Sequence, residues 1–166
     1  RIKVLWSISP APENGRFLIG LIADRPDSEP AHNKAEMFQT VADGYHGSII
    51  ITGAGKGIGR ACARVMAARG AEVIALSRTA ADLDSLRAEI GGRSITVDLA
   101  DPAATRAAMA KAGTCDYLIN SAGVVLLDKA IEVSESAWDT TLDINLKASF
   151  FMAQACAKHM LASGSV

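Results

Sequence analysis

The sequence predicts an α/β fold in which helices cover both faces of a doubly wound, mostly parallel sheet. Three observations support this prediction. From residue 47 onward, short continuous apolar runs, typical of strands buried on both faces, alternate with patterns typical of helices. A glycine-rich turn separates the first run from the first helix, as in right-handed units that connect parallel strands. A chain of 166 residues, 49% of them hydrophobic, also suffices for one domain with a sizeable core.

Residues 1–46 differ in composition from the rest of the chain. Four of the five prolines fall within the first thirty residues, and clusters of Pro, Asp, Glu and Asn indicate loops. Alternating apolar residues over 2–8 and an apolar run over 17–22 predict two short strands. This segment contains no motif. We therefore assign 1–46 to an irregular N-terminal extension of unknown role and 47–166 to the α/β domain.

The domain is expected to begin with a strand over 48–51, where three isoleucines follow one another. The glycine-rich turn then leads into a helix over 58–69, which Gly70 ends. A second buried strand is predicted over 71–76.

The next helix is framed by residues that favour helix ends. Thr79 is expected to cap it, with Asp82 as a partner resembling that of a capping box. Gly91-Gly92 stops it. Its apolar stripe consists of Leu83, Leu86 and Ile90.

Two further strands and two helices complete the pattern. A third strand is predicted over 94–97, after which Asp101 caps a helix that carries Pro102 in its first turn. A fourth strand follows over 117–119, and a long helix over 136–162.

Composition excludes several classes of function. Seventeen basic and eighteen acidic residues give a formal charge of −1, so no basic surplus favours nucleic acid. No apolar run approaches the roughly 20 residues that cross a bilayer. Three scattered cysteines (Cys62, Cys115 and Cys156) form no C-x-x-C pair and indicate free thiols in a reducing compartment rather than disulfides or a metal site. The sequence begins with Arg1 and lacks the layout of a signal peptide, so we expect a cytoplasmic protein.

The glycine-rich turn is the strongest chemical signal in the sequence. Gly53, Gly57 and Gly59 follow the spacing G-x-x-x-G-x-G, and Gly55 lies between them. The commoner G-x-G-x-x-G spacing fails because Ile58 stands at its last position, and the turn does not match a P-loop either. Between a buried strand and a helix, glycines let free backbone N–H groups approach an anion closely. The turn therefore predicts a site for the diphosphate of a dinucleotide.

With this turn in view, the chain over 47–166 resembles the short-chain dehydrogenase/reductase family. The resemblance implies a Rossmann-type domain, of which the sequence holds the first four strands and their helices. Four stretches in the family's order carry it: Thr52–Gly59, Asp98-Leu99, Asn120-Ser121-Ala122-Gly123 and Asp143-Ile144-Asn145-Leu146.

The resemblance implies a role for each stretch. The turn, with Lys56 and Ile58, would bind the cofactor, and Asp98 and Leu99 would lie near its adenine. Asn120, Ala122 and Gly123 would brace the sheet and line the cofactor cleft, although Ser121 replaces the family's second Asn. Asn145 matches the asparagine of the family's catalytic tetrad. Taken alone, Asp98 and Asn120 could be turn residues, and Asn145 a polar residue facing solvent.

The end of the second strand favours NADP(H) as the cofactor. NAD-dependent sites of this kind carry a carboxylate there, which binds the ribose 2′-hydroxyl and would repel a 2′-phosphate. Here Ser77 stands in its place, followed by Arg78 and Thr79. Arg78 and Lys56 could each contribute about 1.5–3 kcal/mol to binding the 2′-phosphate through charge-assisted hydrogen bonds. The alternative is that both are ordinary surface charges.

The family's proton-transferring segment is not found. It consists of a Tyr-x-x-x-Lys motif and a Ser, but Ile49 follows Tyr45 at that spacing and Ser121 follows Tyr117. We therefore expect the sequence to be truncated within the fold, with Asn145 as its only tetrad member, and this polypeptide alone to be inactive. The fourth strand would then form an unprotected sheet edge, which predicts a marginally stable fragment.

The long helix over 136–162 carries more apolar residues than one sheet face needs. They are Trp138, Leu142, Leu146, Phe150, Phe151 and Met152. The resemblance suggests a homo-oligomer interface here, and packing in the core is the alternative.

The sequence thus favours the cofactor-binding portion of an NADP(H)-dependent oxidoreductase acting on a small carbonyl or sugar substrate. The run over 52–60 together with Ser77-Arg78-Thr79 and Asp82-Leu83 looks closest to the carbonyl reductase and L-xylulose reductase branch. A 3-oxoacyl-thioester reductase of the same family is one alternative, and a non-catalytic dinucleotide-binding module is another. A methyltransferase using S-adenosylmethionine shares such a turn but needs an acidic residue where Ser77 stands.

Overall fold

The computed structural model describes residues 8–10, 17–19 and 47–163. In the N-terminal part, β1 (Ile8–Pro10) pairs antiparallel with β2 (Phe17–Ile19). The strand predicted over 17–22 is therefore present in its first half. Most of the strand predicted over 2–8 lies outside the described residues, so the division of the chain at residue 46 stays a prediction.

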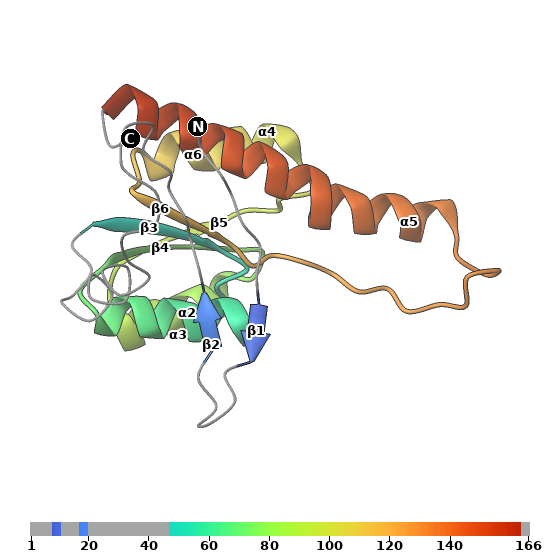
Figure 1. Cartoon of the computed structure of the whole chain (residues 1–166), viewed down its shortest axis with the longest axis horizontal. Coiled ribbons are helices and arrows are strands. Elements are labelled where there is room, and N and C mark those ends of the chain that lie inside the picture. Colours follow the sequence, from blue (N-terminus) through green and yellow to red (C-terminus); the bar gives the residue numbers. More distant parts are fainter. Residues whose placement is uncertain (1–7, 11–16, 20–46, 164–166) are drawn as a thin grey trace, which may run out of the picture.

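A four-stranded parallel sheet forms the centre of the domain (Figure 1). Its strands, in the spatial order β5-β4-β3-β6, are β5 (Arg93–Thr96), β4 (Glu72–Ser77), β3 (Ser48–Thr52) and β6 (Tyr117–Asn120). All three pairings are parallel, which confirms the predicted fold class. The observed strand limits differ from the predicted ones by about one residue.

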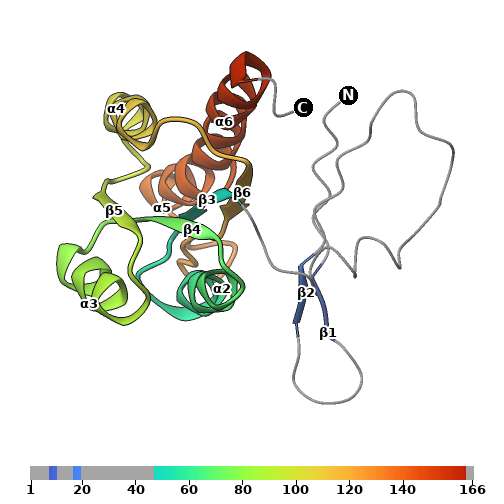
Figure 2. The ribbon, with the colours of Figure 1, turned by 90° about the vertical axis from the view of Figure 1, so that its left-hand side faces the viewer.

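Helices cover both faces of this sheet, as Figures 1 and 2 show. One face carries α2 (Gly57–Ala68) and α3 (Ala80–Ile90), and the other carries α4 (Pro102–Ala112) and α6 (Ser149–Ser163). The sheet is therefore doubly wound.

Alternation along the strands divides the core into two layers. Ile49 and Ile51 of β3 pack toward α2 and α3, whereas Ile50 between them packs toward α4 and α6. Val73 and Ile74 of β4 separate in the same way. Because consecutive strand residues point to opposite faces, a continuous apolar run is what a strand covered on both sides requires.

The predicted long helix is not one regular α-helix. It begins as α5 (Glu135–Leu142), continues through a π-helical segment, η1 (Asp143–Ala148), and ends as α6. The side chain of Ser134 caps its start by accepting a hydrogen bond from the backbone N–H of Ala137 (3.2 Å). The prediction of a continuous helix over 136–162 was wrong in this respect, because nothing in the apolar spacing signals a π turn.

Capping predictions had mixed outcomes. Asp101 caps α4 as predicted: its Oδ1 accepts hydrogen bonds from the N–H groups of Ala103 (2.7 Å) and Ala104 (3.1 Å). Thr79 occupies the N-cap position of α3, but its side chain forms no capping hydrogen bond. The capping-box role of Asp82 was also wrong, because its carboxylate pairs with Lys56 instead.

The chain order creates a crevice at the carboxyl ends of the strands. The chain passes from β3 to β4 and β5, then returns to place β6 on the other side of β3. At such a reversal the connections leave in opposite directions, and ligands bind there in open α/β sheets. Thr52 and Asn120, the last residues of β3 and β6, are direct neighbours in the register. β6 is also an edge of the sheet, as predicted for the fourth strand.

The described residues can be searched for disulfides, metal-binding groups and membrane-spanning helices. Within 47–163 all three cysteines are buried and free of disulfides. The described part of the chain contains no group of three His, Cys, Asp or Glu residues suited to a metal ion. No helix that the structure describes combines the length and apolarity needed to span a membrane.

Candidate functional site

A cleft with a volume of about 290 Å³ lies at the strand reversal. It brings together most of the predicted cofactor-binding residues, from four separate stretches of the chain. These are Gly53, Lys56, Ser77, Arg78, Thr79, Asp98, Leu99, Ala122 and Gly123. The remaining lining residues were not predicted to belong to the site: Asp82, Val97, Val124 and Ile144.

The glycine-rich turn fits closely against its surroundings. Gly53 has a φ of +66°, and a Cβ atom added there would come within 2.8 Å of the Cα atom of Ala122. A Cβ on Gly59 would overlap the carbonyl oxygen of Gly53, and one on Gly55 would lie 2.8 Å from Ser77 Oγ. Gly57, with a φ of +53°, meets nothing within 4 Å. Three of the glycines therefore allow close packing of the turn, and the fourth leaves open space beside the start of α2.

Helix starts at the cleft differ from those elsewhere in the domain. The N-cap residues of α2 and α3, Lys56 and Thr79, form no side-chain capping bonds, and both residues line the cleft. The starts of α4 and α5 are capped by Asp101 and Ser134. The first N–H groups of a helix have no partner within the helix, and they favour anions. An uncapped start in a cleft is therefore suited to bind phosphate groups.

A buried hydroxyl joins the two sides of the crevice. Thr52, only 1% exposed, accepts hydrogen bonds at Oγ1 from the N–H groups of Ser121 (3.0 Å) and Ala122 (3.1 Å). This contact holds the loop after β6 beside the glycine-rich turn. Sequence reasoning missed the role of Thr52, because the contact depends on the register between β3 and β6.

Asn120 braces the long helix. Its Nδ2 donates a hydrogen bond to the carbonyl oxygen of Ser149 (3.1 Å), at the start of α6. The structure thus gives Asn120 a bracing contact and does not place it among the cleft-lining residues. Four further residues predicted to bind the cofactor lie in or next to the glycine-rich turn but do not line the cleft: Gly55, Gly57, Ile58 and Gly59.

Asn145 holds the loop that follows Gly123. Its Oδ1 accepts from the N–H of Val124, and its Nδ2 donates to the carbonyl oxygen of the same residue, both at 2.8 Å. A Cβ added to Gly123 would lie 3.2 Å from Asn145 Oδ1, so the small residue permits this approach. Asn145 itself does not line the cleft, although the preceding residue, Ile144, does.

Asp98 and Leu99 form the wall of the cleft beyond β5. Asp98 is exposed, and its Oδ1 accepts from the N–H of Ala100 (3.0 Å), as in a turn. Leu99 is buried beside it and belongs to the core layer on the α4 side. An exposed carboxylate next to an apolar wall suits an adenine, whose faces are apolar and whose amino group donates.

Charged side chains gather where α2 and α3 begin. Lys56 Nζ lies 3.2 Å from Asp82 Oδ2, with the lysine side chain 78% exposed and the aspartate side chain 24% exposed. Arg78 is exposed on the same wall. The two cations predicted to meet a 2′-phosphate therefore share the cleft with a carboxylate.

Arg60 supports the site through structural contacts that sequence reasoning missed. Its Nη1 donates to the carbonyl oxygens of Gly55 (3.2 Å) and Asp82 (3.1 Å), which fixes the turn against the first turn of α3. Its Nη2 donates to Glu89 (3.0 Å). Hydrogen bonds from Arg64 and then from Arg60 hold the pKa of Glu89 below its usual range. These contacts join α2 to α3 beside the site.

Buried thiols lie away from this chemistry. Burial raises the pKa of Cys62. Cys156 donates a hydrogen bond to Cys115, which lowers the pKa of Cys115 and raises that of Cys156. Neither pair member lines the cleft.

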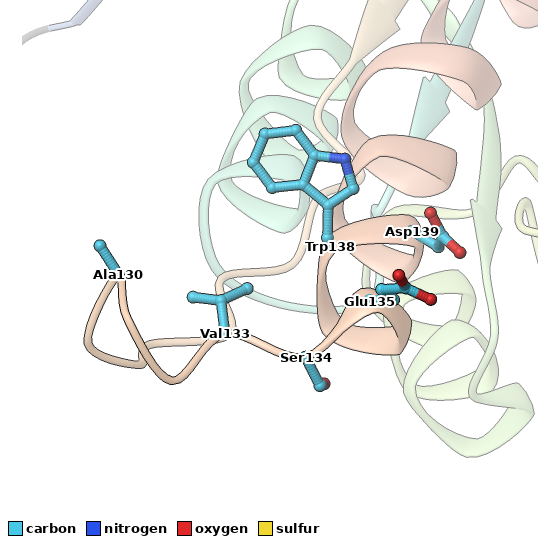
Figure 3. A pocket seen from close by; sticks show the side chains of 6 residues that line it. All are labelled: Ala130, Val133, Ser134, Glu135, Trp138 and Asp139. Atoms are coloured by element: carbon cyan, nitrogen blue, oxygen red, sulfur yellow. The ribbon is translucent and has the colours of Figure 1, made fainter.

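A second, larger hollow of about 510 Å³ lies at the start of α5 (Figure 3). Loop 130–134 folds beside the first turn of the helix, and the indole of Trp138 points away from the carboxylates of Glu135 and Asp139. No predicted site residue lines this hollow.

Several known proteins are similar in sequence to this chain. L-xylulose reductase of Mesocricetus auratus is 45% identical over 117 residues, which are 70% of this chain and 48% of that protein. D-erythrulose reductase of Gallus gallus is 45% identical over 69% of this chain and 47% of that protein. Carbonyl reductase [NADPH] 2 of Sus scrofa is 37% identical over 69% and 48%, respectively. The chain thus spans about half the length of the curated relatives it matches.

A solved structure and a family match agree with these relatives. A short chain dehydrogenase/reductase family protein superposes with a TM-score of 0.68 and 32% identity, over 70% of this chain and 51% of that one. The sequence also matches the model of the short chain dehydrogenase family, over residues 48–166. This range contains the sheet, the glycine-rich turn and the cleft, and the chain belongs to the short-chain dehydrogenase/reductase family.

Proposed function

We propose that the protein is an oxidoreductase that uses NADP(H) to reduce a carbonyl or sugar-type substrate to an alcohol, or catalyses the reverse reaction. This chain would form its cofactor-binding portion. The observation that carries the proposal is the cleft in which two uncapped helix starts meet Lys56 and Arg78. The names of relatives that act on xylulose, erythrulose and carbonyl compounds support the substrate class.

The glycines of the turn fit a bound dinucleotide. Gly57 opens into free space next to the N–H groups at the start of α2, where a diphosphate would bind. Asp98 and Leu99 would contact the adenine, and Ala122 and Gly123 would line the path toward the reacting ring. The cofactor would supply or accept a hydride, and the chain would orient it.

NADP(H) is favoured over NAD(H) by the side chains at the carboxyl end of β4 and directly after it. Ser77 offers a hydroxyl where a carboxylate would repel a 2′-phosphate, and Arg78 and Thr79 extend the same wall. The uncapped start of α3 adds N–H groups that favour an anion.

Cofactor titration tests this proposal. Binding of NADPH and NADH, followed by nicotinamide fluorescence, should show tighter binding of NADPH. Ser77→Asp should weaken NADPH binding about tenfold or more, because it places a carboxylate against the 2′-phosphate. Ser77→Ala is the matched control and should keep the preference. Equal affinities for NADPH and NADH in the unaltered protein would contradict it.

Asn145 is proposed to belong to a proton-transfer tetrad, as the resemblance implies. The other members of that tetrad, a Ser and a Tyr-x-x-x-Lys motif, are not found in this sequence. We therefore expect this chain to bind the cofactor without transferring hydride. Detectable reduction of xylulose or erythrulose by this polypeptide alone would contradict that expectation.

Membership of the short-chain dehydrogenase/reductase family excludes the methyltransferase. Two alternatives to the proposed reductase remain to be tested, a 3-oxoacyl-thioester reductase and a non-catalytic dinucleotide-binding module. The coding sequence beyond Val166 separates the enzyme from the non-catalytic module, because only the enzyme needs a Ser followed by a Tyr-x-x-x-Lys motif. If that segment is present, a panel of a ketose, a diketone and a 3-oxoacyl thioester, offered with NADPH to a protein that includes it, separates the sugar reductase from the thioester reductase. We further propose that it acts in the cytoplasm, in keeping with its three free cysteines.

We also propose a homo-oligomer that forms through the long helix. Its large apolar side chains are exposed at Trp138 (60%), Leu146 (65%) and Phe150 (60%). Such surface is rarely left in contact with water. Sedimentation of the protein should show a dimer or larger species, and Phe150→Glu should dissociate it.

A further inference from the structure

Asp82 is a carboxylate inside the cleft that our proposed function assigns to a phosphate. Its Oδ2 lies 3.2 Å from Lys56 Nζ, and both residues line the cleft together with Ser77 and Arg78. The side chain does not cap α3. Its negative charge therefore remains available to act on a ligand in the cleft.

The position of Asp82 is fixed by contacts with the glycine-rich turn. Its carbonyl oxygen accepts a hydrogen bond from Arg60, which also binds the carbonyl oxygen of Gly55. A Cβ on Gly55 would lie only 3.1 Å from Asp82 Cβ. The residue is thus held against the turn, and its carboxylate stays near any anion bound there.

Two electrostatic effects of Asp82 oppose a 2′-phosphate. The carboxylate pairs with the ammonium group of Lys56 and so competes with the phosphate for that cation. Asp82 also lies in the first turn of α3, where its charge offsets the positive end of the helix dipole. Both effects act on a phosphate dianion more strongly than on a neutral 2′-hydroxyl.

Resting on the proposed function, we propose that Asp82 is a specificity-determining residue that restrains the preference for NADP(H). The affinity of the cleft for a 2′-phosphorylated adenosine is lower than Lys56 and Arg78 alone would give. The carboxylate reduces the difference between the affinities of the cleft for NADP(H) and for NAD(H).

Two adenosine nucleotides test this inference without any catalytic reaction. Calorimetric titration with adenosine 2′,5′-bisphosphate and with adenosine 5′-monophosphate compares ligands that differ only in the 2′-phosphate. Asp82→Asn should tighten bisphosphate binding about threefold to tenfold, because it removes the charge and keeps the shape. Binding of the monophosphate should stay within about twofold, since it lacks the opposing phosphate.

Asp84→Asn is the matched control. Asp84 lies on the same helix, pairs with Arg87 (3.2 Å) and does not line the cleft. The same change in net charge there should alter bisphosphate binding less than twofold, because exposed charges outside the site are screened. Asp82→Ser, read in the same way, replaces Asp82→Asn if the latter fails to fold by circular dichroism.

The outcomes separate this inference from the proposed function. Unchanged or weaker bisphosphate binding in Asp82→Asn overturns the inference, as does an equal gain for the monophosphate or for Asp84→Asn. If the unaltered protein binds both nucleotides equally and only Asp82→Asn prefers the bisphosphate, the inference stands and the NADP(H) preference falls. If neither protein binds either nucleotide, both proposals fail.

Discussion

The carboxamide of Asn145 forms a reciprocal pair of hydrogen bonds with the backbone of Val124, each 2.8 Å long. The side chain thus pairs with both the backbone N–H and the backbone carbonyl of Val124, as a neighbouring β-strand would. Because Val124 lines the cleft, a side chain on the π-helical segment positions the wall of the site.

Removal of this pair should loosen the loop at Val124. Asn145→Ala loses two hydrogen bonds and should lower the free energy of unfolding by about 1–2 kcal/mol. Asn145→Asp keeps the acceptor for the Val124 N–H and should protect that amide better than Ala does. Hydrogen exchange at Val124 checks both changes, and unaltered protection in Asn145→Ala would contradict the assignment.

Thr52 should be intolerant of an isosteric change. Thr52→Val leaves the N–H groups of Ser121 and Ala122 without their acceptor and should cost about 1–3 kcal/mol of stability. Thr52→Ser keeps the hydroxyl and serves as the control. Urea unfolding of the three proteins measures the difference, and equal stability of the Val and Ser variants would show that the hydroxyl is unimportant.

Two glycines of the turn should respond differently to alanine. Gly53→Ala combines a positive φ with a contact of 2.8 Å to the backbone of Ala122, so the loop must shift. We expect a loss of about 2–4 kcal/mol. Gly57→Ala meets only the conformational penalty, about 1 kcal/mol, because the space beside it is open. Thermal unfolding of both variants tests the ranking, which the reverse order would refute.

Glu89 should make stability depend on pH. Its folded pKa is lowered, chiefly by the hydrogen bond from Arg64, so its contribution is present above the unfolded pKa and is lost as pH falls through the folded value. Glu89→Gln should therefore be less stable than the parent at pH 7, and the difference should shrink on acidification below about pH 4.3. Denaturant unfolding across this range measures the effect. Glu72→Gln, the same change at an exposed position on β4, is the control for the substitution itself.

Much of the sheet could be predicted because its signals are local. The isoleucine run over 49–51 and the glycines that end α2 and α3 depend only on neighbours in sequence. Long-range contacts could not be predicted in the same way. The hydroxyl of Thr52 meets its partners 69 and 70 residues later, and the pairing of Lys56 with Asp82 depends on how α2 and α3 pack.

Family resemblance located the cleft better than it described individual side chains. Nine of the fourteen residues predicted to bind the cofactor line the cleft. Asn120 contacts Ser149 rather than the cleft, and the predicted capping box at Thr79 is absent. A sequence motif fixes the neighbourhood of such residues, whereas the direction of each polar side chain depends on competition among nearby donors and acceptors.

The guanidinium of Arg60 donates hydrogen bonds to the carbonyl oxygens of both Gly55 and Asp82. The glycine-rich turn and the start of α3 are therefore mechanically joined. If the cleft binds the proposed dinucleotide, redesigning the residues at the end of β4 and the start of α3 to exchange one coenzyme for another will also disturb the turn, so selectivity and overall affinity will have to be re-optimised together.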